Sequence, residues 1–208
     1  MKETFRAFLL LIIIAIGFTA CDEKKNEIVA GDEYTVNLLM DRTEKDFQLK
    51  NDPRSPFNMD PEVVFENLKY FPPDSNYIFK SKLYRFETLD TIIIMGTRGE
   101  QRKAVKEGYV LLSFKGKDHN LNVYKSFGPQ DQPYFSIWFT DESSGKDTYH
   151  IGRYLDFTLE EDEDYIYTID FNRAYNPYCA YSELFTCPIP TKEDHLSFAI
   201  MAGEKNFN

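Results

Sequence analysis

The spacing of apolar residues along the chain changes after Asn76. From Asp32 to about Leu49 the apolar residues recur at helical spacing, and the charged residues fall mostly on the opposite face. This pattern predicts an amphipathic helix, ended by two X-Pro pairs at residues 52–53 and 55–56. The apolar residues that fall near one face of this helix are Val36, Leu39, Met40 and Phe47.

A second, short helix is expected directly after Asp60. Asp60 can cap it, Pro61 fits its first turn, and Glu62 complements the helix dipole. Phe65 and Leu68 would then point inward, and the two prolines at residues 72–73 would end the helix.

Beyond Asn76 the pattern has a period of two, which is typical of strands with one buried face. Turn residues separate these segments, and residues 115–118 predict a hairpin. The connections are short and no helices alternate with the strands. We therefore expect a mainly β domain, an antiparallel sandwich or barrel-like sheet with one or two N-terminal helices packed outside. The predicted strands are 77–79, 83–86, 91–95, 108–114, 121–124, 134–140, 154–159, 165–171 and 195–201.

The first residues have the form of a secretory signal. Lys2 and Arg6 precede an apolar run over residues 7–18, which is too short to span a bilayer as a helix. The run ends at Cys21 in a sequence that looks like a bacterial lipobox. We expect a lipoprotein signal peptide over 1–20, lipidation of Cys21, a tether over 21–31 and one globular domain over 32–208. The alternative is an ordinary signal peptide followed by a free cysteine.

These features place the protein in the bacterial cell envelope, periplasmic or surface-exposed, with the N-terminal lipid as its membrane contact. Removal of residues 1–20 takes away two basic residues and one acidic residue, so the formal charge changes from −10 to −11. A surface this acidic argues against nucleic acid as a partner and against electrostatic docking on anionic lipid.

Cys179 and Cys187 lie eight positions apart, and in an exported protein a disulfide is the expected state. It would close a short loop and contribute about 2–3 kcal/mol in the chain-entropy model. Two alternatives are a metal site completed by His150 or His195, and Cys179 as a nucleophile with a histidine base. Because the chain has no CxxC or HxxxH pair, we expect no metal and no cofactor.

The segment 170–190 concentrates polar and aromatic residues, and further charges lie at Arg153 and near the C-terminus. One interpretation is a set of buried ion pairs that tie strand ends together. The other is a pocket in which cations bind an anionic group and amides and a tyrosine orient it. The candidate ligand-binding residues are Arg153, Asp170, Asn172, Arg173, Asn176, Tyr181, Glu204 and Lys205.

Three blocks of residues form a wider pattern. They are Arg42, Lys45-Asp46-Phe47, Ser55-Pro56-Phe57, Phe65, Leu68 and Tyr70-Phe71-Pro72; then Asp141, Gly145, Thr148-Tyr149 and Gly152 to Asp156; then Asp170 to Pro177, Cys179-Ala180-Tyr181, Cys187-Pro188, Glu193 and Ala202 to Lys205. Together they resemble the bacterial and archaeal domain-of-unknown-function family 1684. The resemblance covers nearly the whole mature chain, which looks like a short, lipoprotein form. Asp194 departs from it, because asparagine is usual there.

The resemblance implies no substrate and no mechanism. Our leading hypothesis is a lipid-anchored envelope protein that binds a small polar or anionic ligand, or a protein partner, at these residues. The first alternative is a hydrolase in which Asp170 or Glu204 is the acid or base and Arg153 with Arg173 forms a clamp. The second is a purely structural envelope subunit.

Overall fold

The computed structural model describes residues 32–128 and 131–207, so the predicted signal peptide, tether and Cys21 lie outside the described residues. Helix α1 spans Glu33–Asn51. The side chain of Asp32 caps it by accepting a hydrogen bond from the backbone N–H of Thr35 at 2.7 Å. The helix ends before the Asp52-Pro53 pair, as predicted, because the residue before proline avoids the helical conformation. None of the helices in the described ranges is long and apolar enough to cross a membrane.

The orientation of α1 differs from the amphipathic prediction. The buried residues of the helix are Thr35, Leu38 and Leu49, whereas Val36, Leu39, Met40 and Phe47 are exposed. The inner face attaches to the domain largely through hydrogen bonds and ion pairs, including one from Tyr34 to Asp170 and one from Lys45 to Glu204. A polar inner face of this kind leaves the apolar stripe on the outside.

The prediction of a second helix after Asp60 is wrong. Helix α2 spans Pro56–Met59, and Asp60 lies at its C-terminal end. The Asp60 carboxylate accepts hydrogen bonds from the Glu62 N–H at 3.0 Å and from the Ser182 hydroxyl at 2.5 Å. The side chain that could cap a helix therefore forms a local turn and a long-range contact instead. Leu68 still reaches the core, in a cluster with Phe57.

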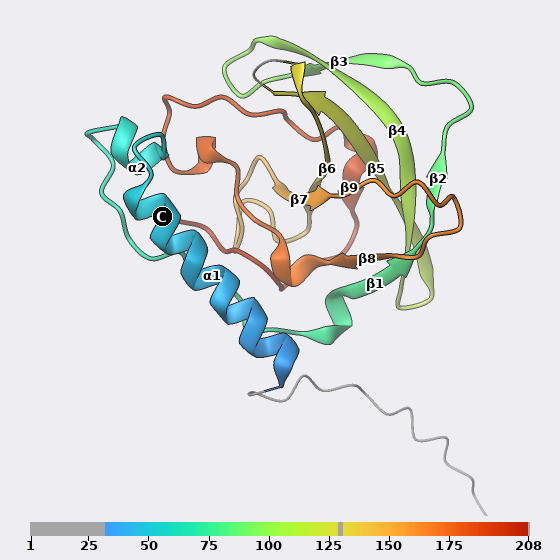
Figure 1. The fold of residues 1–208 in the computed structure, drawn as a ribbon, viewed down its shortest axis with the longest axis horizontal. Coiled ribbons are helices and arrows are strands. Elements are labelled where there is room, and N and C mark those ends of the chain that lie inside the picture. Colours follow the sequence, from blue (N-terminus) through green and yellow to red (C-terminus); the bar gives the residue numbers. More distant parts are fainter. Residues whose placement is uncertain (1–31, 129–130, 208) are drawn as a thin grey trace, which may run out of the picture.

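The β region forms two sheets, and every strand pair is antiparallel except the β6–β9 pair (Figure 1). The larger sheet has the order β2-β4-β5-β6-β7, with β3 paired to β4 and β9 paired to β6; the smaller sheet pairs β1 with β8. The predicted closing strand over 195–201 is reduced to two residues. The bounds are β1 Ile78–Ser81, β2 Leu83–Arg85, β3 Thr91–Met95, β4 Gln101–Phe114, β5 Lys117–Phe127, β6 Pro133–Asp141, β7 Arg153–Phe157, β8 Tyr167–Asp170 and β9 His195–Leu196.

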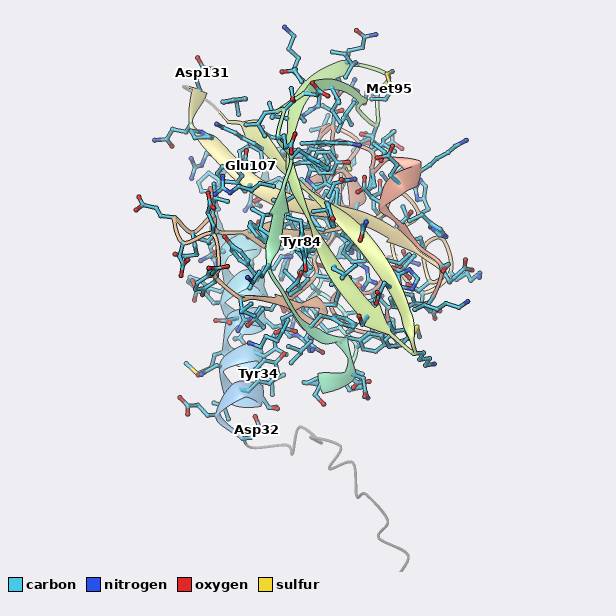
Figure 2. All side chains as sticks on the ribbon, turned by 90° about the vertical axis from the view of Figure 1, so that its right-hand side faces the viewer. Asp32, Tyr34, Tyr84, Met95, Glu107 and Asp131 are labelled. Atoms are coloured by element: carbon cyan, nitrogen blue, oxygen red, sulfur yellow. The ribbon has the colours of Figure 1, made fainter. Side chains whose placement is uncertain are left out.

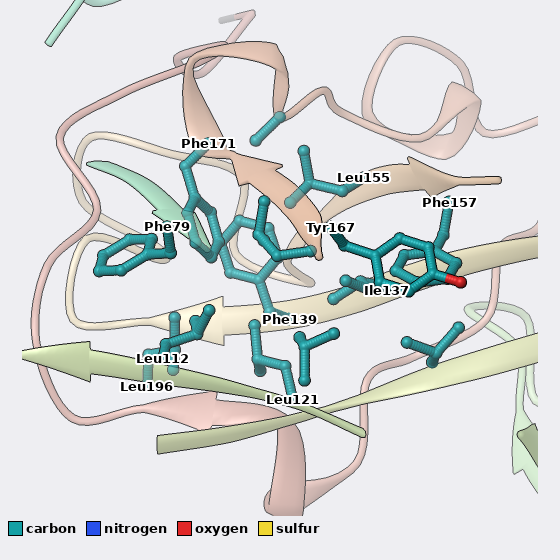
Figure 3. Close-up of a cluster of buried hydrophobic side chains, with 14 of the residues drawn as sticks. Phe79, Leu112, Leu121, Ile137, Phe139, Leu155, Phe157, Tyr167, Phe171 and Leu196 are labelled. Atoms are coloured by element: carbon teal, nitrogen blue, oxygen red, sulfur yellow. The ribbon is translucent and has the colours of Figure 1, made fainter. Parts of the chain in front are cut away.

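The main core fills the space between the two sheets. Figure 3 shows Leu112 and Leu121 of the larger sheet on one side and Phe79, Tyr167 and Phe171 on the other. These side chains alternate along their strands with outward-facing residues, as expected for packed sheets. The arrangement is sandwich-like, which confirms the prediction of a mainly β fold with an N-terminal helix packed outside.

A second cluster lies on the other face of the large sheet, where Trp138 stacks on Tyr124 with ring centroids 4.4 Å apart. Helix α1 lies beside the smaller sheet and the segment that follows β8 (Figure 1). In the view of Figure 2, the strand with Tyr84 lies in front, and α1, whose N-terminal end is marked by the labels Asp32 and Tyr34, extends below it. The space between α1 and the strands is where the candidate site is found.

Candidate functional site

A cavity of about 760 Å³ lies between α1, strands β7 and β8, and the segment that follows β8. Apolar side chains of the strands, among them Leu155, Phe157 and Ile169, form part of its lining. Charged side chains of α1 and of the segment after β8 form the rest, together with several tyrosines. A mostly preformed concave site with an apolar floor and a few polar groups is the usual form of a small-molecule site.

Four of the eight predicted ligand-binding residues line this cavity: Asp170, Asn172, Arg173 and Asn176. A 3₁₀ turn over Phe171–Arg173 directly after β8 brings the first three together, and Asp170 caps it by accepting the Asn172 N–H at 3.0 Å. The buried Asn172 side chain exchanges two hydrogen bonds with the backbone of Asp74, which fixes the turn against the domain.

The Asp170 carboxylate is contacted by hydrogen-bond donors or a cation from three residues. One oxygen accepts the backbone N–H and the side-chain amide of Asn172, each at 3.0 Å. The other accepts the Tyr34 hydroxyl of α1 at 2.7 Å and lies 3.5 Å from Nε of Arg173. Burial, followed by the contact with Asp170, raises the pKa of Tyr34 well above its usual range, so the phenol keeps its proton.

Arg173 crosses the cavity edge. Its Nη1 lies 2.6 Å from an Asp41 oxygen on α1, and both side chains are about half exposed. The guanidinium is therefore shared between Asp41 and Asp170 and keeps access to solvent.

The other four predicted residues lie away from the cavity lining. Arg153 is fully buried and pairs with Asp141 at 2.9 Å. Its remaining hydrogen bonds go to the carbonyl oxygens of Ile200, Ala202 and Glu204. Lys205 places its ammonium over the Phe71 ring, 4.6 Å from the centroid. The three cations Arg153, Arg173 and Lys205 thus occupy separate environments and do not converge.

Glu204 and Tyr181 support the cavity wall from behind. The fully buried Glu204 carboxylate accepts the Tyr181 hydroxyl, the Asn176 side-chain amide at 2.8 Å and the Asn176 N–H at 3.1 Å. It also pairs with Lys45 of α1 at 2.9 Å. Burial, then the negative charge of Glu204, raises the pKa of Tyr181 well above its usual range. Glu204 therefore positions Asn176 and Lys45 at the cavity.

Arg42, Lys45 and Tyr70 also line the cavity, and the site prediction missed them. Arg42 donates to the carbonyl oxygens of Phe71 at 3.0 Å and Asn172 at 3.1 Å, and its guanidinium lies 4.4 Å from the Tyr70 ring centroid. Burial lowers its pKa. All three residues belong to the pattern by which the chain resembles family 1684, so the sequence did carry a signal for them.

Three buried polar atoms on cavity-lining residues have no hydrogen-bond partner among the described residues: Nε of Arg42, the hydroxyl of Tyr70 and Oδ1 of Asn176. Within the same ranges, no carboxylate lies within ion-pair distance of Arg42. Buried polar groups are nearly always paired, so three such atoms around one cavity indicate that a ligand or water molecules form hydrogen bonds there.

The structure does not contain the predicted disulfide. Cys179 and Cys187 are both free thiols, and the Cys179 N–H donates to Sγ of Cys187 at 3.3 Å. The hydrogen bond between the two thiols and burial raise the pKa of Cys187, while the same hydrogen bond lowers the pKa of Cys179. In the part of the chain that the structure describes, no group of three or more His, Cys, Asp or Glu residues is placed to hold a metal ion.

Residues 63–205 match the model of a protein family of unknown function, DUF1684. The chain belongs to the DUF1684 family. A solved structure is also similar, the solution NMR structure of the uncharacterized protein from gene locus rrnAC0354 of Haloarcula marismortui. It is 27% identical, with a TM-score of 0.62 over 83% of this chain and 94% of that one. No curated protein matches. The DUF1684 assignment confirms the resemblance and assigns no activity.

Proposed function

We propose that this DUF1684 protein is a lipid-anchored protein of the cell envelope that binds a small polar ligand with an anionic group in the cavity beneath α1. The observation that carries the proposal is Arg42, a partly buried cation on the cavity wall without a carboxylate partner among the described residues. An arginine that keeps a free N–H donor in a sheltered site is suited to a carboxylate or phosphate.

The neighbouring groups support the same chemistry. The Tyr70 hydroxyl can donate and Oδ1 of Asn176 can accept, so a ligand that also carries hydroxyl groups would satisfy both. Lys45 is neutralised by Glu204 and Arg173 by Asp41 and Asp170, which leaves Arg42 as the cation best suited to pair with a ligand. Apolar strand residues and tyrosines then provide the surface for the rest of the molecule.

Hydrolysis receives less support than binding. Asp170 does line the cavity, but four donors from Asn172, Tyr34 and Arg173 surround its carboxylate. Glu204 is fully buried behind the wall, with its own four donors. A general acid or base must reach the reacting atom, and both carboxylates are nearly buried and already accept several hydrogen bonds or ion pairs. The proposed arginine clamp also lacks Arg153, which pairs with Asp141 instead.

The experiment is a thermal-shift titration of the wild-type protein and the Arg42→Ala variant with phosphate, citrate and glucuronate, and with glucose as the neutral comparison. We expect at least one anion to raise the melting temperature of the wild type. Loss of a charge-assisted hydrogen bond should weaken this binding by roughly tenfold or more in Arg42→Ala. Arg98→Ala removes an equal charge from an exposed turn and should bind like the wild type. Equal shifts in all three proteins, or none in any, would refute the proposal.

A further inference from the structure

The outer face of α1 carries a stripe of large apolar side chains. Val36 is 45% exposed, Leu39 49%, Met40 63% and Phe47 62%. At 3.6 residues per turn these four positions fall within about 100° of the helix circumference. The helix attaches to the domain through Leu38, Arg42, Lys45 and Leu49, which lie on the other side.

A stripe of this kind is not explained by the packing of the domain. Single exposed apolar residues are ordinary on protein surfaces, but four large apolar side chains gathered on one face of a helix mark a surface that contacts something else. The inner face of α1 already fixes the helix through Tyr34, Arg42 and Lys45, so the stripe is not needed to hold the helix in place. The stripe therefore points to a partner outside the domain.

The position of α1 in the chain identifies that partner. Helix α1 begins at Glu33, and only residues 21–31 separate the predicted lipid-bearing Cys21 from its N-cap Asp32. Eleven residues can extend to at most about 36–40 Å. The helix is 19 residues long, which corresponds to roughly 28 Å. A domain anchored at Cys21 therefore keeps this stripe within reach of the bilayer surface.

The size and charge of the surface disfavour a second copy of the chain. Four side chains of this kind expose on the order of a few hundred Å², whereas a stable dimer buries about 800 Å² on each partner. The strong net negative charge also makes two copies repel each other. The same charge opposes attraction to anionic lipid, so the fitting surface is a neutral bilayer entered by apolar side chains.

We propose that the outer face of α1, made by Val36, Leu39, Met40 and Phe47, lies in the interface of a zwitterionic bilayer. This inference rests on the proposed lipid anchor, which brings the helix to the membrane. The opposite face of the same helix forms a wall of the ligand cavity. Contact with the bilayer would thus fix the orientation of the cavity relative to the membrane.

Tryptophan fluorescence can test this contact in the full-length protein, reconstituted into phosphatidylcholine vesicles with or without brominated acyl chains. The only tryptophan of the chain, Trp138, is buried and gives a constant background. We expect Phe47→Trp to shift to shorter wavelength on vesicles and to lose emission to the brominated lipid. The matched control is Ile93→Trp, since Ile93 is 54% exposed on β3, far from α1 in Figures 1 and 2, and it should do neither.

Quenching of both variants alike, or of neither, would overturn the inference. A short-wavelength emission of Phe47→Trp before lipid is added would also overturn it. Dependence on protein concentration would then identify a second copy, and independence would identify another segment of the same chain. Mass spectrometry of the N-terminal peptide tests the anchor separately. If Cys21 carries an acyl chain and Phe47→Trp is not quenched, the bilayer contact alone fails. If Cys21 carries no acyl chain, the proposed anchor fails, and the contact that rests on it fails as well.

Discussion

Buried charges hold the C-terminal segment of this protein against its sheet. Arg153 donates to Asp141 and to three backbone carbonyl oxygens between Ile200 and Glu204. Asp141 in turn accepts from Ser143 and from the N–H of Ile200. Each partner satisfies groups that would otherwise be buried without hydrogen bonds. The pair therefore acts as one network, and loss of either member leaves the other charge uncompensated.

The Arg153→Met variant should lose about 3–5 kcal/mol of unfolding free energy, because it leaves the Asp141 carboxylate buried without its cation. Urea denaturation followed by far-ultraviolet circular dichroism measures the change. Arg54→Met removes an arginine whose ion pair with Asp52 is exposed, and it should leave the unfolding midpoint nearly unchanged. A similarly small effect in Arg153→Met would show that the network is not stabilising.

Residue type alone does not separate network charges from cavity charges. Arg153 and Arg173 both follow the family pattern, yet one is enclosed by carbonyl oxygens and the other reaches solvent. The sequence-based prediction correctly grouped Asp170, Asn172, Arg173 and Asn176 in one site, because they share one short segment. It did not assign Arg42, Lys45 and Tyr70 to the site, because these residues reach the cavity only through tertiary packing.

At the scale of elements, hydrophobic periodicity predicted α1 but not its orientation. The apolar stripe of an amphipathic helix normally faces the core, but here hydrogen bonds from Tyr34, Arg42 and Lys45 hold the helix by its other face. The prediction of a second helix was wrong for a related reason. The Asp60 carboxylate accepts hydrogen bonds within a turn and from Ser182, so it does not cap a helix. Most strands were located by alternation, which is a local signal of a half-buried sheet, but β4 begins at Gln101 instead of residue 108 and the closing strand has only two residues.

The turn between β3 and β4 predicts a pH effect on stability. The Glu100 carboxylate there accepts hydrogen bonds from the Thr186 hydroxyl and then from Arg102, which lower its pKa from 4.5 to about 2. The ionised form is therefore favoured in the folded state, and its contribution is present above pH 4.5 and lost as the pH falls toward 2. Glu100→Gln should be less stable than the wild type at pH 7, and this difference should disappear across that window.

Urea denaturation at a series of pH values measures this difference. The control is Glu87→Gln, an exposed position whose side chain has no hydrogen bond or ion pair with the residues that the structure describes, and its stability should follow the wild type at every pH. A constant gap between wild type and Glu100→Gln from pH 7 to pH 2 would contradict the assignment.

At the scale of the whole molecule, the sequence predicted the layers but not the position of the cavity beneath α1. Two sheets and an outer helix follow from the order of helical and alternating segments. The cavity depends on how far α1 stands from β7 and β8, and bridging side chains such as Arg173 and Tyr34 set this distance. Such contacts join residues more than 130 positions apart, which no local pattern records.

The proposed location of the molecule at a membrane depends on lipidation of Cys21. Several acyl chains on one cysteine hold a protein stably at a membrane, whereas one chain binds only marginally. The α1 stripe adds too little apolar area to replace them, and the acidic surface adds no attraction to anionic lipid.

Cys21→Ala should therefore move most of the full-length protein from the membrane fraction to the soluble envelope fraction and abolish incorporation of labelled palmitate. Cys187→Ala, which also removes one thiol, should remain in the membrane fraction and keep the label. Full membrane retention of Cys21→Ala would show that the fold, rather than a lipid, is what binds the bilayer.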